Sequence, residues 1–216
     1  FIADKLAPEG VNALNHYAEL EVDFAPGLSV AEALSHARDA DAIIVRSATK
    51  IRGELLDACT KLKVVGRAGI GVDNIDIATA TERGIVVLNT PDANATTTAE
   101  LAIAHMFSLS RHIPDADRSV RSGNWTPAKF LGAELSGKTV GVVGFGTIGR
   151  LVAERCRGLN MTVVGHDPFV TESTFTEHGV EVRELDALLQ EVDYVSLHCP
   201  VTESTRGLLG AERLAR

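Results

Sequence analysis

The sequence predicts an α/β protein made of two lobes, each a parallel β-sheet covered by helices. Short apolar strands alternate with helical segments over the whole chain, which is typical of such sheets. A glycine-rich turn at residues 144–149 follows one of these strands and opens a helix. The chain of 216 residues is long enough for one large domain or two smaller ones with buried cores.

The first lobe is predicted to alternate strands with helices from its first residues. Ser29 has the chemistry of a helix N-cap, and Gly84 that of a helix end. Strands are expected at residues 2–4, 21–24, 42–46, 63–66 and 85–88, and helices are expected to begin near Pro8, Ser29, Ile51 and Asn74.

A long helix at residues 96–111 is predicted to lead from the first lobe to the second. It follows a loop at residues 89–94, and Pro114 is suited to begin the next helix. We place the lobe boundary in this loop, with residues 1–92 in the first lobe and residues 93–216, including the connecting helix, in the second. Further strands are expected from Thr139 and at residues 162–165, 180–182 and 194–197.

The glycine-rich turn predicts a dinucleotide-binding site. Gly144 allows the chain to turn tightly after its strand, and the missing side chain at Gly146 lets the backbone approach a pyrophosphate. Gly149 lets the following helix lie close to the strand. The alternative is a turn whose glycines serve only close packing.

Residues on either side of this helix complete the predicted nucleotide site. The amides of Thr147 and Ile148 open the helix, where unpaired N–H groups and the positive end of the helix dipole attract phosphate. Asp167 ends the next apolar strand, where a carboxylate accepts both ribose hydroxyls and repels a 2′-phosphate. We therefore expect the cofactor to be NAD rather than NADP.

Charge and cysteine usage argue against several other classes of protein. The net charge is −8 and basic residues are scattered among acids, so we expect no nucleic-acid partner. The most apolar helix, at residues 101–109, is too short to cross a membrane, and no signal peptide is expected before Phe1. Cys59, Cys156 and Cys199 have neither disulfide nor metal-ligand spacing, which favours reduced thiols in a cytoplasmic protein without a metal site.

Arginines follow two neighbouring strands of the first lobe. Arg46 and Arg67 are expected at the carboxyl ends of parallel strands, where such sheets bind ligands. Their planar guanidinium groups match a carboxylate or a phosphate, and the turn at residues 68–71 offers backbone amides to a carboxylate. The alternative is that both arginines hold loops together by pairing with Asp73, Asp76 or Glu100.

The sequence resembles the D-isomer-specific 2-hydroxyacid dehydrogenases, above all those that oxidise 3-phosphoglycerate. The motifs that carry this resemblance are Arg46-Ser47-Ala48-Thr49, residues 66–76, Asn89-Thr90-Pro91, Ala99-Glu100-Leu101, and residues 111–114, 132–135 and 137–149. The resemblance implies a flavodoxin-like substrate-binding lobe, a Rossmann lobe that is incomplete at the C-terminus, and a homodimer or higher homo-oligomer formed through the nucleotide lobe. It also implies NAD-dependent oxidation of 3-phosphoglycerate to 3-phosphohydroxypyruvate, a step of serine biosynthesis.

The resemblance also assigns binding residues. The substrate contacts that it implies are Arg46, Ser47, Arg67, Gly69 and Asn94. The cofactor contacts that it implies are Ile70, Gly144, Gly146, Thr147, Ile148, Gly149, Asp167 and Cys199. Thr147, Ile70 and Cys199 depart from the residues most frequent in the family, so we expect cofactor affinity to shift.

No residue of this chain is assigned a catalytic role. The resemblance places the substrate-orienting Arg, the acid–base His and its Glu partner after residue 216. Of the histidines present, we weigh only His198 for catalysis, because it ends a strand near the predicted cofactor site, and we interpret it as structural; the others, His166 among them, are interpreted as surface or helix-packing residues. Phe1 begins within a strand and Arg216 ends within a helix, so we expect a fragment that does not turn over alone.

Other functions of the same fold stay open at this point. The substrate could be glyoxylate, hydroxypyruvate or D-lactate, although two arginines suit a doubly anionic phospho-hydroxyacid better. A module that binds NAD and dimerises without catalysis is a further alternative. Trp125, with Phe130 and Leu131, is expected in the core or in a dimer contact.

Overall fold

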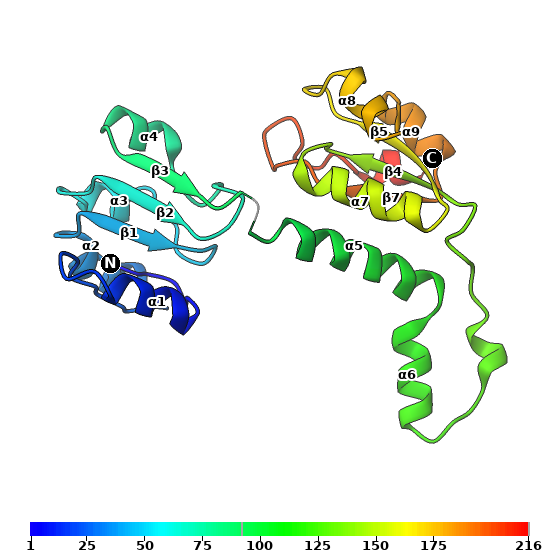
Figure 1. The fold of residues 1–216 in the computed structure, drawn as a ribbon, viewed down its shortest axis with the longest axis horizontal. Helices are drawn as coiled ribbons and strands as arrows, with labels where there is room; N and C mark the ends of the chain where they lie inside the picture. The colour runs from blue at the N-terminus through cyan, green and yellow to red at the C-terminus, as the bar shows by residue number, and fades with distance from the viewer. Residues whose placement is uncertain (92, 216) are drawn as a thin grey trace. The chain divides into compact units, whose positions relative to one another are not determined.

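The computed structural model of the chain describes residues 1–91 and 93–215. It divides into two compact units, Phe1–Asn94 and Ala95–Arg216, and each contains one parallel sheet (Figure 1). Asp92, at which the predicted lobe boundary falls, and Arg216 lie outside the described residues. The α/β class predicted from the alternating pattern is confirmed.

The sheet of the first unit has the strand order of a flavodoxin-like fold. Its strands are β1 (Ala42–Val45), β2 (Val64–Arg67) and β3 (Val86–Asn89), paired in that order. Parallel bridges join Ile2 to Ile44 of β1 and to Phe24, which extends the sheet beyond β1. Numbered along the chain, the five segments lie in the order 2-1-3-4-5, which is that of flavodoxin.

Strands were predicted at residues 2–4 and 21–24, but the structure has only single bridges there. The pairing ends beyond Ala3 because the carboxylate of Asp4 binds loop amides after β1 instead of continuing the edge strand. The predicted helices near Ile51 and Asn74 also begin later, as α3 (Glu54–Ala58) and α4 (Ile77–Glu82). Ile51 and Ile75 form a parallel bridge of their own, so neither segment is free to start its helix earlier.

Helices α1 (Pro8–Asn15) and α2 (Val30–Ala37) begin where the sequence predicts. Ser29 caps α2 through a capping box, in which its hydroxyl accepts the Glu32 amide and the Glu32 carboxylate accepts the Ser29 amide. Gly84 ends α4 with a positive φ of 69°. Apolar side chains of β1, β2 and the helices, among them Ile43, Val65 and Leu56, form the core of this unit.

The second unit contains half of a Rossmann fold. Its strands are β4 (Thr139–Val143), β5 (Thr162–His166), β6 (Glu181–Val182) and β7 (Tyr194–Leu197). They are parallel and lie in the order β6-β5-β4-β7, which is the 3-2-1-4 order of a dinucleotide-binding sheet. The predicted Rossmann lobe is confirmed, and β7 has the bounds that the sequence predicts.

Helices cover both faces of this sheet. On one face, α5 (Ala95–Ser110) packs against α7 (Thr147–Gly158), over a core that includes Val140, Val142 and Val152 (Figure 1). On the other face, α9 (Leu185–Glu191) places Leu188 against Val143 and Val164. The short helices α8 (Glu172–Glu177) and α10 (Ala211–Leu214) complete the unit.

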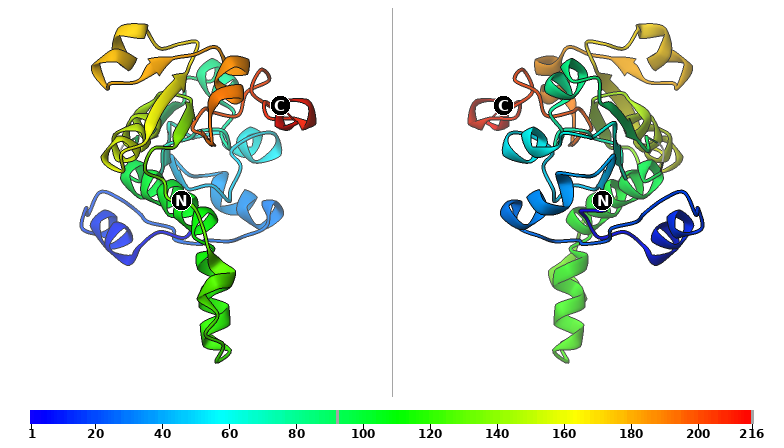
Figure 2. Two further views of the ribbon diagram at one scale, coloured as in Figure 1. Left: turned by 90° about the vertical axis from the view of Figure 1, so that its right-hand side faces the viewer. Right: turned by 90° about the vertical axis from the view of Figure 1, so that its left-hand side faces the viewer.

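An arm stands out from the second unit. It consists of α6 (Ile113–Arg121), the 3₁₀ turn η1 (Pro127–Phe130) and the residues that connect them (Figures 1 and 2). Trp125, between α6 and η1, is 80% exposed, so of the two expected places, the core or a dimer contact, the core is excluded. None of the side chains of α6 is buried. Within residues 1–91 and 93–215, no helix is both long and apolar enough to cross a membrane.

Candidate functional site

A cavity of about 350 Å³ lies at the carboxyl ends of β4, β5 and β7. The residues that line it include Gly144 after β4, Asp167 after β5 and Cys199 after β7. Ligands of parallel α/β sheets bind at this end of the strands. The structure therefore gathers three of the predicted cofactor contacts, which are far apart in the sequence, around one space.

The glycines beside this cavity are required by close packing. Gly144 has a φ of 92°, and a Cβ at this residue would lie 2.4 Å from the Cys199 nitrogen. A Cβ at Gly149 would lie 2.1 Å from the Gly144 carbonyl oxygen, so α7 approaches β4 only because this residue is glycine. The packing roles predicted for both glycines match this geometry.

Gly146 is different, because packing within the protein does not require it. A Cβ there would meet no atom of the part of the chain that the structure describes within 4 Å, so the space beside this residue is open to a ligand. Gly146 caps α7, and Thr147 and Ile148 are the first residues of that helix. Their N–H groups stand at the positive end of a helix of 12 residues, which is the position predicted to hold a phosphate.

The carboxylate of Asp167 is held in place by backbone donors. Its Oδ2 accepts the Phe145 amide at 2.8 Å, and its Oδ1 accepts the Phe169 amide at 2.9 Å. Each oxygen keeps acceptor capacity for a further donor, such as a ribose hydroxyl. Asp167 thus presents a fixed negative charge to the cavity.

His198 precedes Cys199, but its side chain does not line this cavity. It lies in a separate hollow between α5 and β7, where its Nε2 is 2.8 Å from the Ser196 hydroxyl oxygen. Burial lowers the pKa of His198 below its usual value, so the ring is neutral at pH 7. This environment agrees with the structural role that we expected.

In the first unit, the two predicted arginines lie at neighbouring strand ends. Arg67 closes β2 and pairs in register with Val45 on one side and Asn89 on the other, and Arg46 directly follows Val45. Neither guanidinium forms an ion pair with a carboxylate within the described residues. The alternative in which they pair with Asp73, Asp76 or Glu100 is therefore wrong: Asp76 caps α4, and Glu100 pairs with Arg155.

The turn after β2 brings Arg67 and Gly69 together. The Arg67 guanidinium folds over Gly69 so closely that a Cβ on the glycine would lie 1.6 Å from Nη1. The Nε of Arg67 is buried and has no hydrogen-bond partner among the described residues. The Gly69 and Ile70 carbonyls accept the Thr90 amide and the Asn89 side-chain amide. These bonds fix the turn against the end of β3.

Two buried polar residues that the sequence reasoning missed hold the loop at residues 46–49. Asp4 is 4% exposed, and its carboxylate accepts the amides of Arg46 at 2.6 Å and Thr49 at 3.1 Å. Asn74 is 3% exposed and donates from Nδ2 to the carbonyls of the same two residues. The sequence does indicate a position for Asp4, because this residue ends an apolar run that was expected to be a strand.

The remaining predicted contacts sit at loop positions. Ser47 and Asn94 are exposed, and Asn94 is the last residue of the first unit. Ile70, predicted to contact the cofactor, belongs to the first unit, whereas the other predicted cofactor contacts belong to the second. Among the described residues, no cluster of His, Cys, Asp and Glu has the arrangement of a metal site.

Comparisons with known proteins agree with this geometry. The sequence profile of the D-isomer specific 2-hydroxyacid dehydrogenase NAD binding domain matches residues 103–216. D-3-phosphoglycerate dehydrogenase of Archaeoglobus fulgidus is 45% identical over 209 residues, which are 97% of this chain and 40% of that protein. The chain therefore spans about two fifths of the length of the curated relatives that it matches.

Comparison with solved structures also relates this chain to 2-hydroxyacid dehydrogenases. The TT0316 protein of Thermus thermophilus is 34% identical with a TM-score of 0.89, over 99% of this chain and 68% of that one. D-lactate dehydrogenase of Aquifex aeolicus, solved with NAD and lactic acid, is 26% identical with a TM-score of 0.84, over 99% of this chain and 65% of that one. The chain belongs to the D-isomer-specific 2-hydroxyacid dehydrogenase family, and its second unit is the NAD-binding domain of that family.

Proposed function

We propose that this chain is the substrate-binding and NAD-binding part of an enzyme that oxidises 3-phosphoglycerate to 3-phosphohydroxypyruvate in serine biosynthesis. The observation that carries the proposal is the pair Arg46 and Arg67, at adjacent strand ends and without carboxylate partners among the described residues. Two guanidinium groups match a substrate that carries both a carboxylate and a phosphate. Within residues 1–91 and 93–215, the arginines also lack the internal ion pairs that would favour a non-catalytic binding module.

Each unit has its own part in this proposal. Residues 1–92 form the substrate-binding lobe, and residues 93–216 form the NAD-binding lobe. The substrate contacts are Arg46, Ser47, Arg67, Gly69 and Asn94, with the loop at residues 46–49 held by Asp4 and Asn74. The arginines bind the anionic groups, and the amides of the turn at residues 68–71 bind the carboxylate.

The NAD-binding residues orient the cofactor and select it. Thr147 and Ile148 donate their amides to the pyrophosphate beside Gly146, where a Cβ would fill the open space. Asp167 accepts the ribose hydroxyls of the adenosine half and repels a 2′-phosphate. Gly144 and Cys199 line the cavity, and Gly149 lets α7 approach β4 beside it. When bound, NAD supplies the acceptor for the hydride that leaves the substrate.

The proton transfer that accompanies oxidation needs an acid–base group that we assign to no residue of this chain. His198, the one histidine weighed for this role, is hydrogen-bonded to Ser196 in a hollow apart from the nucleotide cavity. By resemblance to the family, the catalytic His, Glu and Arg belong to the part of the relatives that this chain does not span. We therefore expect the chain to bind its ligands without turnover.

Calorimetric titration tests the proposal directly. NAD and NADP are titrated into the purified chain and into Asp167→Ala, with and without 3-phosphoglycerate. We expect the wild-type chain to prefer NAD and the variant to lose that preference, because the carboxylate that rejects the 2′-phosphate is gone. A matched control, Asp186→Ala, removes a carboxylate that pairs with Arg213 outside the cavity and should keep the preference. Equal binding of both cofactors by the wild type would contradict the assignment.

The substrate assignment needs its own comparison. We expect 3-phosphoglycerate to bind more tightly than D-lactate or glyoxylate, and Arg46→Ala and Arg67→Ala each to reduce that difference. Arg52→Ala is the matched control, because its guanidinium binds the Asp73 carbonyl instead. Tighter binding of a small monoanion than of 3-phosphoglycerate would favour another substrate within the same family.

We further propose that the chain is cytoplasmic and assembles as a homodimer or higher homo-oligomer through the second unit. Its three cysteines are free thiols, which suits a reducing compartment. The arm carries a hollow of about 470 Å³ lined by Val120, Trp125 and Leu131 together with polar residues. These three side chains are exposed, and such a patch on a projecting arm fits a second copy of the same chain.

A further inference from the structure

His166 is a titratable side chain of the nucleotide cavity to which the proposed function gives no role. It is the last residue of β5, it directly precedes Asp167, and it is half-buried. The cavity is lined by both residues. An imidazole beside the carboxylate that receives the ribose is placed to contact the same sugar.

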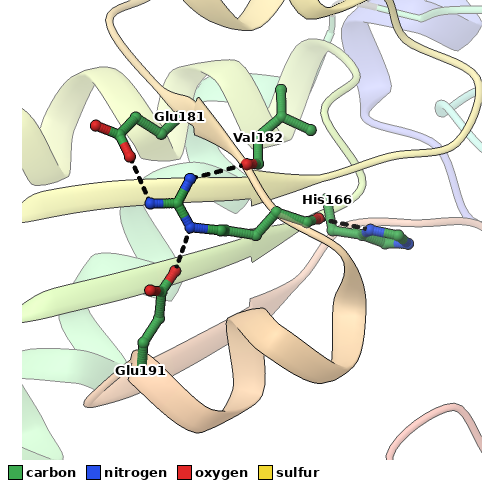
Figure 3. A network of polar contacts seen from close by, with 5 residues as sticks. His166, Glu181, Val182 and Glu191 are labelled. Carbon is green, nitrogen blue, oxygen red and sulfur yellow. Dashed lines mark hydrogen bonds and ion pairs between the residues drawn. The ribbon is translucent and has the colours of Figure 1, made fainter.

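A hydrogen bond fixes which nitrogen of the ring carries the proton. Nδ1 of His166 lies 3.0 Å from the Arg183 carbonyl oxygen (Figure 3). A carbonyl oxygen only accepts, so Nδ1 donates and the neutral ring keeps Nε2 as a bare acceptor. The Nε2 edge is therefore the part of the ring left for a ligand in the cavity that His166 lines.

The charge of Arg183 is compensated by groups on the other side of this network. Its guanidinium binds the Glu181 carboxylate at 2.5 Å, the Glu191 carboxylate at 2.9 Å and the Val182 carbonyl at 3.0 Å. All three of these partners are groups other than the His166 ring. Arg183 thus holds the imidazole through its backbone and leaves no unpaired cation beside it.

The charged groups near the ring are Asp167 and the ion-paired side chains of Arg183, Glu181 and Glu191. Gly144 of the turn after β4 contributes only its backbone, whose amide donates to the His166 carbonyl. Cys199, after β7, lines the same cavity as a free thiol. Glu181 of β6, Arg183 directly after it and Glu191 of α9 form one ion-paired network, in which one guanidinium faces two carboxylates. This network and Asp167 supply fixed negative charge near the ribose site, and the protonation state of His166 is the part of the charge that the pH changes.

We propose that His166 is a second specificity-determining residue for the ribose of the adenosine half. Neutral His166 accepts a ribose hydroxyl at Nε2 and so adds to the preference of Asp167 for NAD. Protonated His166 offers an N–H donor and a positive charge, which bind a 2′-phosphate and offset the repulsion from Asp167. Discrimination against NADP therefore weakens as the pH falls. This inference rests on the proposed placement of the adenosine half in the cavity.

The test measures the affinities of the chain for NAD and NADP by calorimetry at about pH 6 and about pH 8. The variants are His166→Gln and His166→Tyr, which remove the charge and keep a polar or a ring-shaped side chain. Circular dichroism confirms that each is folded. His178→Gln is the matched control, because that ring packs on Phe145 and does not line the cavity.

For the wild type, we expect the affinity for NADP relative to NAD to rise by about three- to tenfold from the higher to the lower pH. Both His166 variants should lose most of that rise, and His178→Gln should keep it. Protonation of the 2′-phosphate of the free nucleotide is the same for every protein compared, so it cancels between wild type and variant.

An equal pH dependence in the wild type and in both His166 variants would overturn the role of His166. A chain that binds no NAD, or an unchanged preference in Asp167→Ala, would instead overturn the placement of the adenosine half and this inference with it. The two failures are thereby told apart in one set of titrations.

Discussion

The three cysteines show how the surroundings of single residues decide their chemistry. Burial raises the pKa of the Cys156 thiol to about 11, and it also raises the pKa of Cys59, against the opposing influence of the Arg83 guanidinium. The thiolate is the reactive form, so both residues are protected from thiol reagents. Cys199 is half-buried and lines the nucleotide cavity.

We predict that a thiol reagent modifies the folded chain first at Cys199 and that NAD slows this reaction. The reason is steric, because a bound nucleotide covers the cavity wall that Cys199 forms. Labelling kinetics followed by peptide mass spectrometry measure the effect. Cys199→Ser should abolish the fast phase, while the unfolded chain should react at all three cysteines. Fast labelling of Cys199 that is unchanged by saturating NAD would contradict the assignment of the cavity.

Loops at the ends of strands depend on buried polar residues as much as on the strands themselves. The loop at residues 46–49 has its amides bound by Asp4 and its carbonyls bound by Asn74. These bonds satisfy backbone groups that a loop turning away from the sheet leaves without ladder partners. Arg46 therefore stands on a loop fixed from both sides.

We predict that Asp4→Ala destabilises the chain by about 1–3 kcal/mol, because it leaves the Arg46 and Thr49 amides without their buried acceptor. Urea unfolding followed by circular dichroism gives the change in the free energy of unfolding. The matched control is Asp41→Ala, an exposed partner of Lys63, which should have little effect. Binding of 3-phosphoglycerate should weaken in Asp4→Ala and not in the control. Equal stability of the two variants would contradict the role of Asp4.

The sequence predicts the bounds of an element when neighbouring residues determine them. It does not predict them when they depend on pairing with a distant segment. The capping box at Ser29, the glycine turn and β7 are set by neighbouring residues. The late starts of α3 and α4 depend on the bridge between Ile51 and Ile75, which no local pattern indicates. For the candidate site the same division holds. The glycine spacing indicated the nucleotide cavity, whereas the fixing of the His166 ring by Arg183 joins residues that are distant in the sequence.

At the scale of the whole molecule, part of the apolar surface that the described residues leave exposed lies on the arm and directly after it. Each unit has its own core of buried apolar side chains, yet Trp125 and Leu131 are 80% and 81% exposed. Large aromatic side chains lose favourable burial when they remain in water, and they are enriched at protein interfaces. A projecting element with such residues gains most when a second copy covers it.

We predict that the chain is dimeric and that Trp125→Asp combined with Leu131→Asp makes it monomeric. Charges at the centre of an apolar interface lose their hydration without gaining partners, so they oppose association. Sedimentation velocity over a range of concentrations measures the oligomeric state, and NAD titration shows whether the nucleotide cavity survives the change. Leu20→Asp is the matched control, because Leu20 is an exposed apolar residue of the first unit and should leave the dimer intact. A wild-type chain that is monomeric at every concentration, or a double variant that stays dimeric, would show that the arm does not form the interface.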